Sequence, residues 1–102
     1  MREDTLTQYL KSLCKGRKKT VKSTDLARVL HMSQTDLRKC VNRLRRKGVP
    51  IASSQDGYFY AVTAGEVYST IRQLRSMASG LEAAIQGLER SLDEFGGKEE
   101  NP

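Results

Sequence analysis

The segment Ser23 to Lys47 constrains the fold more than any other part of this 102-residue sequence. It contains two runs of apolar residues at helical spacing, and each run begins just after a serine, Ser23 or Ser33. Serine is a preferred N-cap, because its side-chain oxygen can accept a free amide of the first helical turn. The pattern therefore predicts two short helices, residues 24–30 and 34–47, joined by a tight turn.

The residues before this pair predict a third helix and a short extended segment. Apolar side chains recur at helical spacing over residues 4–14, with Asp4 or Thr5 available as the cap. Gly16 is a plausible left-handed stop for this helix. Residues 20–22 are β-prone and predict one edge strand.

A β-hairpin is predicted directly after the pair. Gly48 and Pro50 end the second helix, since glycine tolerates a left-handed cap and proline cannot continue a helix. The dipeptide Asp56-Gly57 then lies between two β-prone runs, residues 49–54 and 58–62, and this is a strong hairpin signal.

Two cysteines and three hairpin aromatics could serve either the core or chemistry. Cys14 and Cys40 fall at apolar helical positions and have no metal-ligand spacing, which fits small core residues in a reducing cytosol. Tyr58, Phe59 and Tyr60 could stack on bases, but the alternation of the hairpin favours at least one face as core.

The C-terminal third carries a heptad repeat. Thr63 and Glu66 form a capping box that starts a helix over residues 64–95. Apolar residues then alternate at spacings of four and three over four heptads, with Ile71, Ala78, Ile85 and Leu92 at a, and Val67, Leu74, Leu81, Leu88 and Phe95 at d. Packing onto the chain's own domain explains Val67 and Ile71, but a domain this small cannot cover the whole stripe.

The heptad stripe therefore predicts an oligomer seam, formed by Ile71, Leu74, Ala78, Leu81, Ile85, Leu88 and Leu92. Arg75 and Glu89, both at e, could meet in an antiparallel pair, although parallel pairing and a four-helix bundle remain open. Gly80, Ala84, Gly87 and Ser91 add a stripe of small residues. The predicted organisation is a folded domain (1–62), an oligomerisation helix (63–95) and a disordered tail (96–102).

Positive charge is concentrated in one part of the chain. The net charge is +6, but residues 15–47 contain twelve Lys or Arg and two acidic residues, whereas the remainder is acidic on balance. This split suggests one face that binds a polyanion. No apolar run resembles a signal peptide or a membrane span, so a cytoplasmic location without membrane association is expected.

The region from about residue 5 to residue 62 resembles winged helix-turn-helix regulators of bacteria and phages. The matching residues are Leu26-Ala27 in the first helix, Leu30-His31-Met32-Ser33 in the turn, Leu37, Val41 and Leu44 in the second helix, and Gly48 and Ile51 before the wing. His31 departs from the pattern, because glycine is common there and a positive φ is less easily adopted by histidine. The expected fold is mainly α with a small hairpin, a winged helix-turn-helix domain followed by a long C-terminal coiled-coil helix.

The resemblance implies that helix 34–47 enters the major groove of DNA. Its side opposite the apolar stripe then supplies the base contacts, predicted as Gln34, Thr35, Arg38, Lys39 and Asn42. Phosphate contacts are predicted from Lys18, Lys19, Lys22, Ser33, Arg43, Arg45, Arg46 and Lys47, with Lys15 and Arg17 nearby. The wing tip contributes little, since Asp56 repels phosphate.

These features predict a sequence-specific double-stranded DNA-binding protein, a dimeric and repressor-like transcriptional regulator. Two alternatives remain: a protein-interaction or inhibitor module that uses the basic face, and a binder of structured RNA. No acid or nucleophile accompanies His31 in the sequence, so no enzyme activity, metal or cofactor is expected.

Overall fold

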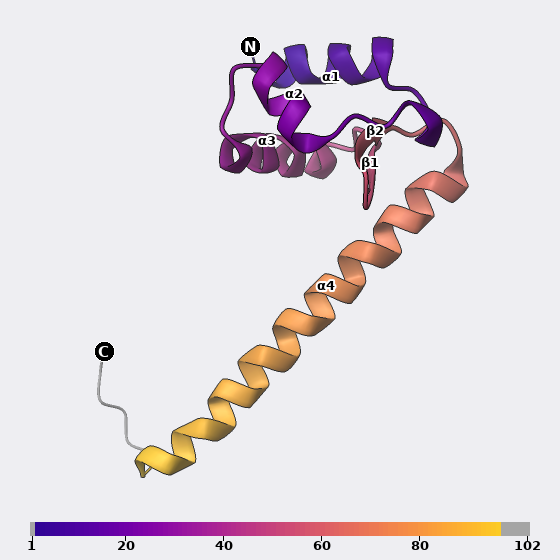
Figure 1. Ribbon diagram of the computed structural model, residues 1–102. Helices are drawn as coiled ribbons and strands as arrows, with labels where there is room; N and C mark the ends of the chain where they lie inside the picture. The colour runs from indigo at the N-terminus through magenta and orange to yellow at the C-terminus, as the bar shows by residue number, and fades with distance from the viewer. Residues whose placement is uncertain (1, 97–102) are drawn as a thin grey trace. The chain divides into compact units, whose positions relative to one another are not determined.

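The computed structural model describes residues 2–96, which are mainly helical with one small antiparallel hairpin (Figure 1). The chain divides into two compact units, one ending at Thr70 and one beginning at Ile71. The elements in order are α1 (Arg2–Leu13), η1 (Arg17–Lys19), α2 (Ser23–Val29), α3 (Gln34–Arg46), β1 (Ile51–Ser54), β2 (Gly57–Tyr60), α4 (Ala64–Ser91) and η2 (Leu92–Phe95).

The first two helices begin earlier than the sequence predicted. α1 starts at Arg2, so Asp4 lies inside its first turn, where acidic side chains oppose the positive end of the helix dipole. The prediction of Ser23 as a cap was wrong. Lys22 is the N-cap: its extended backbone accepts the Leu26 amide at 2.9 Å, and no side chain caps α2.

The turn and the ends of α3 follow the sequence prediction closely. His31 adopts a positive φ of 55°, the only such value outside glycine in the described residues. The Ser33 hydroxyl accepts the Asp36 amide at 3.0 Å, which confirms it as the N-cap of α3. Gly48, at φ 92°, then ends the helix: its amide and that of the following residue bond back to carbonyls of the last turn, a Schellman motif.

The hairpin is present, with shorter strands than predicted. Ile51 pairs with Tyr60 and Ser54 with Gly57, which leaves Gln55 and Asp56 as a two-residue loop. Val21 extends this sheet, because it exchanges two backbone hydrogen bonds of 2.9 Å with Tyr58. The expected edge strand is thus a single bridge.

Gly57 is needed for a close backbone approach as well as for the turn. Its φ is 139°, and a Cβ at this position would lie 2.0 Å from the Val21 carbonyl oxygen. No other residue allows the chain before α2 to approach the hairpin so closely. Gly16 also has a positive φ (84°), but its ψ of 158° is extended, so the predicted left-handed stop was wrong.

Two groups of buried side chains hold the first unit together. Phe59 packs with Ala52, Ala61 and the partly buried Val67, so the first turns of α4 help to cover one face of the hairpin. The larger cluster joins α1, α2, α3 and β1, and Tyr58 and Tyr60 pack against it. Its buried members are Leu6, Leu10, Cys14, Leu26, Ala27, Met32, Leu37, Cys40, Val41, Leu44 and Ile51. The prediction of the cysteines and hairpin aromatics as core residues is confirmed.

The start of α4 is capped locally and is fixed to the hairpin. Thr63 Oγ1 accepts the Glu66 amide at 3.1 Å, and Glu66 Oε1 accepts the Val62 amide at 2.8 Å. Farther along, Thr70 Oγ1 accepts the Ser53 amide at 3.1 Å. The compact unit therefore extends eight residues beyond the boundary that the sequence suggested at residue 62.

The second unit consists of the rest of α4 and η2. The α-helix ends at Ser91 and tightens to a 3-10 turn over Leu92–Phe95, where the sequence predicted continued α-helix. Gly96 closes this turn in a left-handed conformation. The rest of the predicted tail, residues 97–102, lies outside the described residues.

Candidate nucleic-acid interface

The outward side of α3 presents polar side chains that have no partner of their own. Its inward side is buried in the core through Leu37, Cys40, Val41 and Leu44. The opposite side is exposed, and within residues 2–96 none of its side chains forms a hydrogen bond or ion pair. These residues are Gln34, Thr35, Arg38, Lys39, Asn42 and Arg46. The five predicted base-contacting residues are thus brought together on one accessible face of one helix.

Arg45, in contrast, is directed into the hairpin. Its Nε donates to the Ile51 carbonyl at 2.8 Å and its Nη2 to Ser53 Oγ at 3.2 Å. The guanidinium also lies 5.9 Å from the centre of the Tyr58 ring, within the range of a cation–π contact. Burial lowers the pKa of this guanidinium. Arg45 therefore braces the hairpin against α3, whereas the sequence had assigned this side chain to a phosphate contact.

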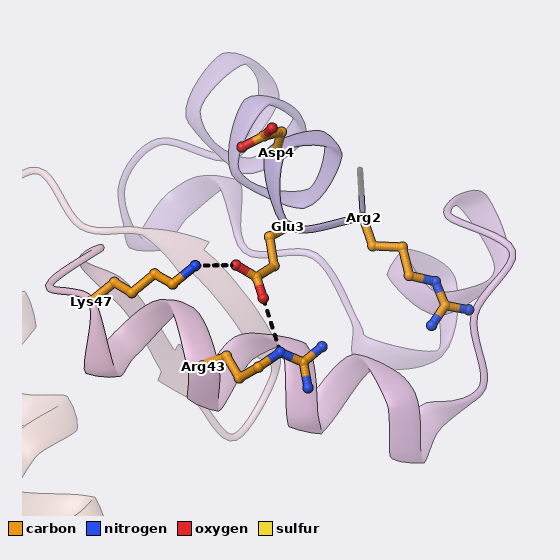
Figure 2. Close-up of a pocket in the computed structure, with 5 residues that line it drawn as sticks. All are labelled: Arg2, Glu3, Asp4, Arg43 and Lys47. Atoms are coloured by element: carbon orange, nitrogen blue, oxygen red, sulfur yellow. Dashed lines mark hydrogen bonds and ion pairs between the residues drawn. The ribbon is translucent and has the colours of Figure 1, made fainter.

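Glu3 in α1 holds two further cations of α3 (Figure 2). Its carboxylate accepts from Lys47 Nζ at 2.7 Å and from Arg43 Nε at 2.9 Å. Figure 2 shows the Glu3 carboxylate between these two side chains, whereas Arg2 and Asp4 point away from it. The hydrogen bonds from Lys47 and Arg43 lower the pKa of Glu3, so this carboxyl stays ionised to lower pH than usual.

This ion-pair cluster contains two residues that the sequence predicted as phosphate contacts. Arg43 and Lys47 remain largely exposed, but each already has a carboxylate partner. A phosphate that binds them must share them with Glu3 or displace it. Local sequence patterns do not predict this arrangement, because Glu3 lies 40 residues from Arg43. Arg2 makes a similar contact across the chain, 3.7 Å from Asp36.

A second group of cations lies in the segment between α1 and α2. Its members are all exposed: Lys15, Arg17, Lys18, Lys19 and Lys22. The backbone of this segment is held in place, since the Gly16 amide donates to the Tyr60 carbonyl at 2.8 Å and the Arg17 amide to Glu66 Oε2 at 3.2 Å. Amide donation, chiefly from Val62, lowers the pKa of Glu66 and keeps this anchor ionised. The lysine side chains thus project from an ordered backbone.

The hairpin loop is polar and carries no cation. Gln55 and Asp56 are exposed, and the Asp56 amide donates to Ser54 Oγ at 3.1 Å. An aspartate at this position repels phosphate, so the tip adds no electrostatic attraction for a polyanion. Any recognition by the first unit therefore falls mainly on α3 and the basic segment.

The reactive side chains of residues 2–96 do not converge. Cys14 and Cys40 are buried thiols, and burial raises the pKa of both, which lowers their reactivity. Within residues 2–96, no three residues among His, Cys, Asp and Glu are placed to hold a metal ion. In the same range, no helix is both long enough and apolar enough to span a lipid bilayer.

The first unit therefore offers exposed cations on an ordered backbone and, on α3, an exposed face of hydrogen-bonding side chains. The chain matches no protein-family model, and no curated protein and no solved structure shows significant similarity to it.

Proposed function

We propose that residues 2–70 form a winged helix-turn-helix domain that binds double-stranded DNA, and that the chain acts as a dimeric transcriptional regulator in the cytoplasm. The observation that carries this proposal is the exposed face of α3, where six polar side chains have no partner within the described chain. Helices that read DNA present such a face to the major groove, and the hairpin that follows α3 corresponds to the wing.

Sequence is read, in this proposal, by the N-terminal two thirds of α3. Arg38 and Lys39 suit the O6 and N7 acceptors of guanine, and Gln34 and Asn42 suit the N6 and N7 atoms of adenine. Thr35 can donate a hydrogen bond or contact a thymine methyl group. A well-formed bidentate contact contributes about 1–3 kcal/mol of discrimination against a wrong base.

Affinity comes from phosphate contacts around this face. Lys18, Lys19, Lys22 and Arg46 are exposed and have no acidic partner in residues 2–96. The Ser33 hydroxyl accepts the Asp36 amide and still has its own proton to donate to a phosphate. Arg43 and Lys47 contribute after exchanging Glu3 for phosphate, while Arg45 is omitted because it braces the hairpin.

The test is binding of short duplexes, measured by fluorescence anisotropy at several salt concentrations. The proposal expects the logarithm of affinity to fall linearly with the logarithm of salt, with a slope of about −0.9 for each phosphate neutralised. Arg38→Ala and Lys39→Ala should relax preference at one base position each among sequences selected from a random pool. Arg90→Ala, which removes an equal charge from α4, is the matched control and should leave preference unchanged.

Failure to bind any duplex at about 50 mM salt would overturn the proposal, because non-specific electrostatic binding alone is measurable there. Preference for an A-form RNA duplex over B-form DNA would point instead to structured RNA. If the protein bound neither duplex DNA nor duplex RNA, an acidic protein would become the favoured partner of the basic face.

A further inference from the structure

The apolar stripe of the second unit is exposed from Leu74 onward. Leu81 and Leu88 are 68% and 70% exposed, and Ile85 is 50% exposed. The stripe continues through Leu92 and Phe95, which are 54% and 69% exposed. Its a and d spacing is that of a coiled-coil seam, which requires a second helix of matching length.

We infer that this stripe pairs with the stripe of a second copy in antiparallel orientation, with Ala78 opposite the partner's Leu88. The inference deepens the proposed dimer, and so rests on it, but it does not depend on DNA binding. Two independent features of residues 71–95 favour this orientation and register: the charges that flank the stripe and the sizes of the residues within it.

The charges beside the stripe are all on one side. The e positions are Arg75, Glu82 and Glu89, whereas the corresponding g positions, Met77, Ala84 and Ser91, carry no charge. Parallel helices pair e with g, so they would gain no ion pair. Antiparallel helices pair e with e, and this places Arg75 beside the partner's Glu89 twice per dimer. Glu82 then lies near its own copy at the two-fold axis, a cost that the parallel dimer avoids.

The residue sizes favour the same orientation. A parallel dimer pairs each residue with itself, so Ala78 would meet Ala78 of the partner subunit and leave a cavity in the seam. The antiparallel register pairs a with d throughout. Ala78 then faces a leucine, Leu81 faces the partner's Ile85, and Leu74 faces the partner's Leu92, so no layer contains two small residues.

The neighbouring register, shifted by one heptad, covers less of the stripe. It would place Arg75 beside the partner's Glu82 but would set Phe95 opposite the partner's Ala64, a small residue at the start of α4. It would also need Val67 to face the partner's Leu92, and Val67 already packs against Phe59 in the first unit. The register with Ala78 opposite the partner's Leu88 pairs every a and d residue from Leu74 to Leu92, and it places Ile71 opposite the 3-10 turn that contains Phe95.

Disulfide cross-linking of the full chain, without DNA, tests orientation and register together. Variants with one added cysteine, Ala78→Cys and Leu88→Cys, are oxidised separately and as a mixture, and products are identified by mass. The antiparallel register predicts no self-linked dimer of either variant and a 78–88 link in the mixture. Wild type is the control for Cys14 and Cys40, which are buried and should give no link.

Each alternative outcome is distinct. Self-linked Ala78→Cys dimers would show parallel pairing and overturn the inference. A link between Ala78→Cys and Leu81→Cys, in place of the 78–88 link, would show the shifted register. A monomer by light scattering at micromolar concentration would refute the seam altogether. Duplex binding is measured separately, and it shows whether the proposed DNA-binding function holds when the antiparallel dimer does not.

Charge reversal gives a second measurement that does not rely on thiols. Arg75→Glu and Glu89→Arg should each raise the dimer dissociation constant about tenfold, since every dimer contains two of these pairs. The double variant should recover most of the wild-type affinity. In a parallel dimer, the single substitutions would have little effect and the double variant would show no recovery.

Discussion

Residues 2–70 and residues 71–95 both carry leucines at helical spacing, but the two regions differ in what covers them. Leu6 and Leu10 of α1 are fully buried, whereas Leu81 and Leu88 of α4 are more than two-thirds exposed. The stripe on α1 is covered because α2, α3 and β1 of the same chain supply the opposite surface. Periodicity alone therefore specifies which face of a helix is apolar, and not which molecule covers that face.

Shortening one leucine in each region tests whether the two apolar stripes are covered differently. Leu10→Ala should lower the free energy of unfolding by about 2–5 kcal/mol, because it leaves a cavity in a closed core. Leu81→Ala should instead weaken dimerisation and leave the unfolding of the first region almost unchanged. Urea unfolding followed by tyrosine fluorescence, at two protein concentrations, separates the two effects. Equal losses of unfolding free energy in the two variants, independent of protein concentration, would show that the regions form one core.

The closure of the first region can be tested at Gly57. Gly57→Ala places a Cβ 2.0 Å from the Val21 carbonyl oxygen, so the segment before α2 must move away from the hairpin. We expect a loss above about 2 kcal/mol and faster exchange of the Val21 amide. Gly48→Ala is the control: it also has a positive φ but has no atom within 4 Å, so it should cost only about 1–2 kcal/mol. A smaller effect at Gly57 than at Gly48 would contradict the close approach.

The adjacent residues Arg45 and Arg46 differ in whether the side chain has a hydrogen-bond partner within residues 2–96. Arg45→Met should destabilise the first region by about 1.5–3 kcal/mol, since it removes charged hydrogen bonds to Ile51 and Ser53. Arg46→Met should change stability by less than about 0.5 kcal/mol. It should instead reduce the salt slope of duplex binding by about one. Thermal unfolding and fluorescence anisotropy, measured on both variants, test these two assignments. A larger loss of stability in Arg46→Met than in Arg45→Met would contradict them.

The smallest expected effect on stability is at Glu3. Glu3→Gln releases Arg43 and Lys47, so duplex binding should tighten and the salt slope should steepen by up to about two. Its ion pairs lower the pKa of Glu3 in the folded state, so their contribution to stability is present above the pKa of the unfolded chain. That contribution is lost as pH falls through the folded-state pKa.

Acid unfolding of wild type and Glu3→Gln measures this loss. The two stability profiles should converge at low pH and separate above the unfolded-state pKa of the glutamate. Asp4→Asn is the control, because Asp4 points away from both cations (Figure 2). Unchanged duplex affinity and salt slope in Glu3→Gln would show that phosphate does not compete for Arg43 and Lys47.

Elements with local signals could be predicted from the sequence alone. The buried stripe of α3, its Ser33 cap, its stop at Gly48 and the capping box of α4 all depend on residues within a few positions of one another. The heptad stripe is local in the same sense. These patterns were therefore readable before the structure, with errors of a few residues at helix and strand ends.

Which charged side chains lack a partner in residues 2–96 became clear from the packing of the elements and not from the sequence. Arg45 and Arg46 are neighbours of the same type, and helix packing directs one into the hairpin and leaves the other exposed. Glu3 meets Arg43 and Lys47, and Gly57 meets Val21, across separations of more than thirty residues. Such contacts depend on how the helices and the hairpin pack together, and packing distances are not encoded in the spacing of any single segment.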